Sequence, residues 1–159
     1  MSKYPNIQIS NHHGGMTLIE LMVVLAIVIL ISTISVVSFG QFRRNVALDA
    51  ARQDIISALL EARGLSLSSK DASVYGVHFE TTQVVRFTGA TYSASATSNV
   101  TRLFDPRVYT VAINLSGGGS ELVFERLTGE ASKSGTIVVA TYVGDKRATT
   151  SVSLGGIIE

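Results

Sequence analysis

The chain has 159 residues with no cysteine, 46% hydrophobic residues and a formal net charge of +1, and its mean hydropathy is +0.35. This length suits one modest domain with an appendage, and the absence of cysteine excludes disulfides, a bacterial lipobox and thiolate metal sites. Lys3 is the one charged residue among the first fifteen. The rest of the chain is therefore balanced in charge and has no general electrostatic preference for nucleic acid or acidic partners.

Residues 1–15 are polar and end in two glycines, and we predict no regular structure for them. Residues 16–40 form an apolar run in which Glu20 is the one charged side chain. A helix needs about 20 apolar residues to cross the hydrocarbon core of a bilayer. The run therefore predicts a transmembrane helix over residues 16–40, with a carboxylate near its start.

Residues 41–69 keep helical spacing but carry charge on most positions outside one apolar stripe. An amphipathic helix of this kind packs one face on a domain. No proline occurs between Pro5 and Pro106, so we predict one helix of about 75–80 Å through both segments. Gly40 is its one weak position. The predicted stripe consists of Val46, Ala50, Ala51, Ile55, Leu59, Ala62, Ser66 and Leu67.

Residues 70–159 switch to a period of two, which is typical of half-buried antiparallel strands. We predict a hairpin turn over residues 143–147, a flexible connector at 116–120 and a polar surface loop at 90–99. The fold class is therefore α+β, a long N-terminal helix packed on an antiparallel β-sheet domain. The predicted strands cover residues 75–79, 85–87, 109–115, 122–124, 136–143 and 148–154.

Three interpretations compete for the apolar segment. A secretory signal peptide would need a shorter apolar core and a cut beside small residues such as Ser38 and Gly40. A plain single-pass anchor has no use for Glu20, whose charge would cost up to ~3 kcal/mol at the bilayer centre. The third interpretation depends on the residues that surround Glu20.

The stretch GMTLIELMVVLAIVILI, which begins at Gly15, resembles the class III leader junction of type IV prepilins and type II secretion pseudopilins. This resemblance implies cleavage after Gly15 by a prepilin peptidase that also N-methylates the new N-terminus, Met16. It also implies that Glu20 takes part in assembly with other pilin or pseudopilin subunits. The implied partners further include an inner-membrane assembly platform and membrane lipid.

The same resemblance implies a single-pass protein of the cytoplasmic membrane whose C-terminal domain lies outside the cytoplasm and later enters a filament. The positive charges beside the apolar segment instead favour a cytoplasmic C-terminus, because Arg43 and Arg44 follow the segment while Lys3 alone precedes it. We adopt the exported orientation, because it also accounts for the Ser/Thr-rich sheet.

Glu20 lies four residues after Met16, about 6 Å along a helix. When subunits stack, a carboxylate at this depth loses water and needs a cation or a proton. Cleavage creates an amine at Met16 of a neighbouring subunit. We therefore expect Glu20 to pair with that amine, which would select a staggered register and make assembly depend on cleavage.

The C-terminal part resembles the H-type minor pseudopilins (GspH) and the FimT-type minor pilins. The resemblance lies in Phe124, Gly129, the Ser-Gly-Thr-Ile stretch at 134–137 and the glycines at 155 and 156. It implies a minor, tip-associated or initiating subunit that serves protein secretion or pilus assembly. A major type IV pilin and a non-polymerising membrane-anchored binding module remain alternatives.

The sequence predicts no enzyme, cofactor or metal site. Two of the three histidines lie in the leader, which leaves His78, predicted on the polar face of a strand and as a surface residue. Without cysteine or a second histidine, the domain has no nucleophile–base pair and no histidine metal pair. Four arginines of the domain, at 86, 102, 107 and 126, are scattered and predict no nucleic-acid site.

Overall fold

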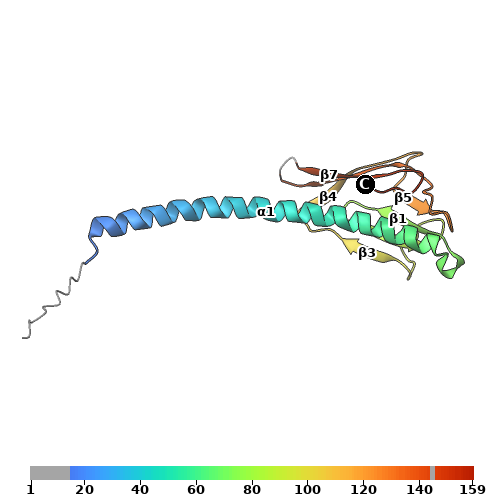
Figure 1. Ribbon diagram of the computed structural model, residues 1–159, viewed down its shortest axis with the longest axis horizontal. Helices are drawn as coiled ribbons and strands as arrows, with labels where there is room; N and C mark the ends of the chain where they lie inside the picture. The colour runs from blue at the N-terminus through green and yellow to red at the C-terminus, as the bar shows by residue number, and fades with distance from the viewer. Residues whose placement is uncertain (1–14, 144–145) are drawn as a thin grey trace, which may run out of the picture. The chain divides into compact units, whose positions relative to one another are not determined.

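The computed structural model describes residues 15–143 and 146–159, with the backbone alone for residues 34–38. Within these residues the chain forms one long helix, α1 (Leu18–Leu67), a short 3-10 helix (Lys70–Ala72) and seven strands (Figure 1). The predicted conformation of residues 1–14 and the central residues of the predicted turn, 144 and 145, lie outside this description. Contacts divide the chain into two units, Met1–Phe39 and Gly40–Glu159.

The described part of the first unit is the beginning of helix α1 and the three residues before it. Every side chain between residues 15 and 33 is exposed to solvent. The hydroxyls of Ser32 and Thr33 donate to the carbonyls of Val28 and Ile29 at 2.7 Å each, so these polar side chains satisfy their donors within the helix. Among the described residues, no helix combines the length and the apolar character that spanning a membrane requires.

The second unit contains two antiparallel sheets, where the sequence had predicted one. The first has the order β3 (Val100–Leu103), β2 (Gln83–Thr88), β1 (Tyr75–Phe79), β5 (Glu121–Phe124). The second has the order β4 (Val108–Leu115), β6 (Gly135–Thr141), β7 (Arg147–Val152). The predicted connector at residues 116–120 carries the chain from β4 in one sheet to β5 in the other, and its three glycines all have positive φ. The α+β fold is confirmed.

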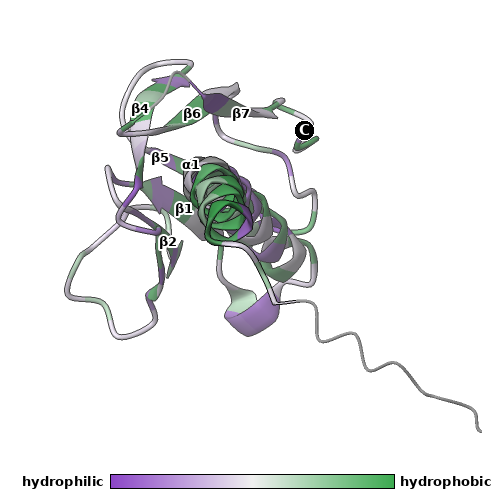
Figure 2. Ribbon diagram, turned by 90° about the vertical axis from the view of Figure 1, so that its left-hand side faces the viewer, coloured by the Kyte–Doolittle hydropathy of each residue, from purple (hydrophilic) through white to green (hydrophobic). Residues whose placement is uncertain are grey.

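Within this unit, helix α1 lies between the two sheets (Figure 2). Half of its buried positions are alanines, which let the sheets approach the helix backbone closely. Strand residues from both sheets, such as Val77 and Ile137, are fully buried in the same core. The buried apolar side chains of α1 are Ala47, Leu48, Ala51, Ile55, Ala58, Leu59 and Ala62.

The apolar stripe therefore differs from the predicted one: three predicted positions are exposed, and three others, Ala47 among them, are buried. Val46, Ala50 and Leu67 are exposed, whereas Leu48 and Ala58 are buried. The helix faces two sheets instead of one. The buried surface of the helix is consequently wider than the single stripe that the spacing suggested, and it is centred nearer to Leu48 than the predicted stripe was.

The C-terminal end of α1 is tied to the first strand by Ser66, which is fully buried. Its hydroxyl accepts the backbone N–H of Tyr75 at 3.0 Å, and its carbonyl accepts the N–H of Leu127, also at 3.0 Å. One turn earlier in the helix, Glu61 forms ion pairs with Arg86 on β2, at 3.1 Å, and Arg102 on β3, at 3.0 Å. These contacts fix the helix against the first sheet.

Candidate functional site

The start of helix α1 brings together the three residues that the sequence singled out. The helix begins at Leu18, and Thr17 caps it: its hydroxyl accepts the backbone N–H of Glu20 at 3.3 Å. Threonine followed three residues later by glutamate is the capping-box pattern. The cap by Thr17 was not anticipated from the sequence, although the pattern Thr-x-x-Glu was present. A carboxylate in the first turn is also favoured by the helix dipole.

Gly15 and Met16 precede the helix and are open to solvent. Met16 is 61% exposed, and a Cβ added at Gly15 would meet no atom within 4 Å. The peptide bond between them, the predicted cleavage site, is therefore sterically accessible. Glu20 is exposed too and forms no ion pair with any described residue. Among residues 15–143 and 146–159, the Glu20 carboxylate thus has no cationic partner, and it lies close to the accessible Gly15–Met16 bond.

An apolar surface follows Glu20 directly on every side of the helix. Its side chains are between 42% and 65% exposed from Leu21 to Ile31. Exposed apolar surface of this extent marks a site of contact with membrane or protein. Its members are Leu21, Met22, Val23, Val24, Leu25, Ile27, Val28, Ile29, Leu30 and Ile31.

His78 is not the surface residue that the strand pattern predicted. Its ring stacks on Tyr92 at 3.9 Å between centroids, and its side chain is 18% exposed. Tyr92 belongs to the predicted loop at 90–99, and its ring also meets Phe87 edge-on. The loop thus covers the outer face of the first sheet. No group of three metal-ligating side chains occurs in the part of the chain that the structure describes.

The four scattered arginines have neighbours within the fold. Arg86 and Arg102 pair with Glu61 of the helix, Arg107 lies 3.7 Å from Asp105, and Arg126 donates to the carbonyl of Ala72. These contacts tie the side chains to the domain surface. They assemble no continuous basic stripe of the kind that nucleic-acid recognition uses.

A family model for the prokaryotic N-terminal methylation motif matches residues 10–36. The match includes Gly15, Met16 and Glu20. It supports a type IV pilin-like protein. A motif of this type implies processing by a prepilin peptidase, membrane anchoring and assembly with other pilin subunits, and its family is structural rather than enzymatic. No curated protein and no solved structure gives a significant match.

Proposed function

We propose that the chain is a minor subunit of a type IV pilus-like or type II secretion pseudopilus filament. The observation that carries this proposal is the start of helix α1. Glu20, which is exposed and has no ion pair with any described residue, lies there between an accessible Gly15–Met16 bond and an exposed apolar helix surface. An isolated subunit gives such a surface no cover, whereas lipid and then neighbouring helices would cover it.

In this proposal, cleavage after Gly15 converts the amide of Met16 into an ammonium group that is then N-methylated. Packing of helices removes water from the first turn, where a single buried charge is strongly disfavoured. The carboxylate of Glu20 and the ammonium of a neighbour's Met16 satisfy each other. Subunits that pack in another register leave both charges unpaired, so the pair selects one stagger.

The assignment to a minor subunit rests on the C-terminal glycines. Gly129 has φ +66°, and a Cβ there would lie 2.7 Å from Cγ of Leu67 at the end of α1. Gly156 has φ +74°, and a Cβ there would collide with the carbonyl of Gly129. Arg63 donates to the carbonyls of Gly129 and Gly155, at 3.2 and 3.4 Å. Close packing of this kind gives a physical reason for glycine at these positions, which are the ones that resemble the H-type pseudopilins and FimT-type pilins.

The test is the N-terminal mass of the protein recovered from a membrane fraction. We expect a chain that starts at N-methylated Met16. A chain that starts at Met1 would leave a plain anchored protein and remove the amine that Glu20 needs. A chain that starts at Gln41 would make this a secreted β-domain and overturn the proposal.

A matched pair of variants separates processing from folding. Gly15→Val should block cleavage, because the peptidase acts at this bond, and no atom lies within 4 Å to make the change disruptive. Gly64→Ala likewise meets no atom within 4 Å and should be processed normally. The number of copies per filament distinguishes a minor subunit from a major pilin: a chain that forms most of the filament mass would overturn the minor assignment alone.

A further inference from the structure

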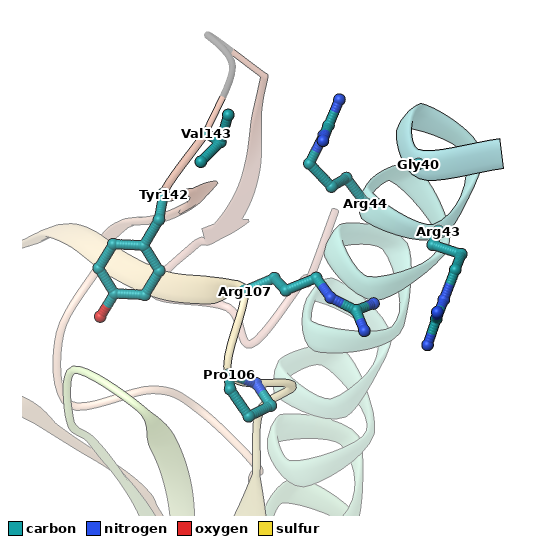
Figure 3. Close-up of a pocket in the computed structure, with 7 residues that line it drawn as sticks. All are labelled: Gly40, Arg43, Arg44, Pro106, Arg107, Tyr142 and Val143. Carbon is teal, nitrogen blue, oxygen red and sulfur yellow. The ribbon is translucent and has the colours of Figure 1, made fainter. Parts of the chain in front are cut away.

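A basic hollow lies at the end of the second unit where helix α1 enters it. Its volume is about 350 Å³, and its walls come from three separate segments (Figure 3). Arg43 and Arg44 belong to the helix, Pro106 and Arg107 to the loop before β4, and Tyr142 and Val143 to the end of β6. Figure 3 shows the guanidinium of Arg107 directed toward the helix and that of Arg44 directed upward in the space between the helix and Val143, while that of Arg43 points downward on the other side of the helix.

A second, separate hollow of about 340 Å³ lies against the next turn of α1. Lys146 and Arg147 line it, together with Asp49. The two hollows therefore gather five basic side chains around one end of the domain. Asp49 lines the second hollow, and Asp105 pairs with Arg107 of the first. Asp145 lies outside the described residues. Arg43 and Arg44 form no ion pair with any described residue.

Exposed apolar side chains stand beside these charges. Tyr142 is 60% exposed, and its ring is held by stacking on Tyr109 at 4.4 Å between centroids. Val143 is 66% exposed and Phe42 is 63% exposed. Rings with one polar end, flanked by basic and apolar side chains, are typical of the boundary between water and lipid.

The position of the cluster along the chain identifies its partner. Arg43 lies four residues after Phe39, about 6 Å along the helix. The headgroup layer on each side of a bilayer is on the order of 5–8 Å thick. If the apolar segment lies in the hydrocarbon core, as the proposed function requires, Arg43 and Arg44 fall at the depth of the lipid phosphates.

We propose that this basic hollow binds the headgroup phosphate of an anionic phospholipid of the phosphatidylglycerol class. The bound lipid fixes the depth and rotation of the subunit in the membrane before it is taken into a filament. The inference rests on the proposed function, because it needs the apolar segment to be in lipid. A lipid fits better than a nucleic acid because Tyr142 and Val143 would meet the glycerol and acyl region, whereas a phosphate backbone would leave them in water.

The full chain contains no cysteine, so Val143→Cys carries a single fluorophore at the rim of the hollow. The labelled protein is reconstituted into vesicles of phosphatidylcholine alone and of equal parts phosphatidylcholine and phosphatidylglycerol. Both contain a trace of lipid with a headgroup spin label. Quenching reports how closely the rim approaches the phosphates, and co-flotation reports whether the chain is anchored.

We expect quenching to rise severalfold in the anionic vesicles. Each basic residue at a surface contributes about 1 kcal/mol, so Arg44→Gln with Arg107→Gln should lower the docked-to-undocked ratio on the order of 25-fold. The control variant with Arg44→Lys and Arg107→Lys keeps both positive charges and should keep the rise in quenching in the anionic vesicles. Lys70→Gln with Arg126→Gln removes equal charge beyond the other end of α1 and should change nothing.

Equal quenching in both kinds of vesicle, or an unchanged response in the glutamine variant, overturns the inference while leaving the proposed function standing. Duplex DNA that displaces the arginine-dependent signal, without any response to phosphatidylglycerol, overturns it in favour of a nucleic-acid site. A chain that floats with neither kind of vesicle overturns the inference together with the anchoring on which it rests.

Discussion

The charge of Glu20 and the helix cap at Thr17 can be tested by separate substitutions. Glutamine is as good as glutamate at the third position of a capping box, so Glu20→Gln keeps the local structure and removes only the charge. If the carboxylate pairs with a neighbour's ammonium, Glu20→Gln leaves that ammonium unpaired in a dry contact. Breaking a buried pair costs about 3–5 kcal/mol, which corresponds to a loss of subunit binding of roughly a hundredfold to several thousandfold.

The capping role predicts a smaller effect at a different residue. The bond from the Glu20 N–H to the Thr17 hydroxyl is 3.3 Å long and exposed, longer than the usual 2.9–3.0 Å. Loss of the cap in Thr17→Ala should therefore cost at the low end of the usual range, about 0.5–1 kcal/mol, or at most about fivefold in assembly. Thr17→Ser keeps the cap and serves as the control.

The assay is the amount of each variant in sheared filaments relative to its amount in the membrane, in cells that carry the assembly machinery. The N-terminal mass of each variant must first show cleavage after Gly15, so that a processing defect is not mistaken for an assembly defect. Wild-type incorporation of Glu20→Gln, or a defect in Thr17→Ala as large as that in Glu20→Gln, would refute the pairing of Glu20 with a neighbour's N-terminus.

Two further predictions concern the globular unit. Ser66→Ala leaves the buried N–H of Tyr75 without its acceptor and should lower the free energy of unfolding by about 1–3 kcal/mol in chemical denaturation. Ser68→Ala, on the exposed surface, is the control. If both variants lower the free energy of unfolding equally, the reasoning is contradicted. Burial, reinforced by Asp71 and Glu80 respectively, raises the pKa of Tyr75 and of Tyr92 above the ordinary value of 10.0. Since the folded state then holds protons that the unfolded state releases, this stabilisation is complete below pH 10.0 and is lost as the pH rises through the folded pKa values. Tyr92→Phe should make the fall in stability above pH 10 shallower, and an unchanged slope would show that Tyr92 is not involved.

The sequence predicts most of the strands because alternation of apolar residues is a local property. Strand β3 was missed, since Val100, Thr101 and Leu103 are all exposed and produce no alternation. Its strand conformation comes from pairing with β2 and from the ion pair between Arg102 and Glu61. Such partners are distant in the chain, and a period-two pattern does not contain them.

The division into two sheets was missed for the same reason. Alternation shows that residues 108–115 and 121–124 are strands, but it does not say that the glycine-rich connector between them leads from one sheet to the other. The burial of Leu48 and Ala58 in place of Val46 and Ala50 follows from this division, because the second sheet covers a second side of the helix. At the N-terminus, by contrast, the motif around Gly15 and Glu20 is contiguous, and the residues proposed for processing and assembly were available from the sequence alone.

The helix at the centre of the core has a mechanical consequence. Ala47, Ala51, Ile55, Leu59 and Ala62 are held between two sheets, so a tensile load applied along α1 enters the domain as shear shared among many small contacts. In a domain joined to its anchor by a loop, the same load would instead break contacts one after another from the point of attachment. We therefore expect the globular unit to withstand extension of α1 as a single rigid body and to yield abruptly, because no contact gives way before its neighbours.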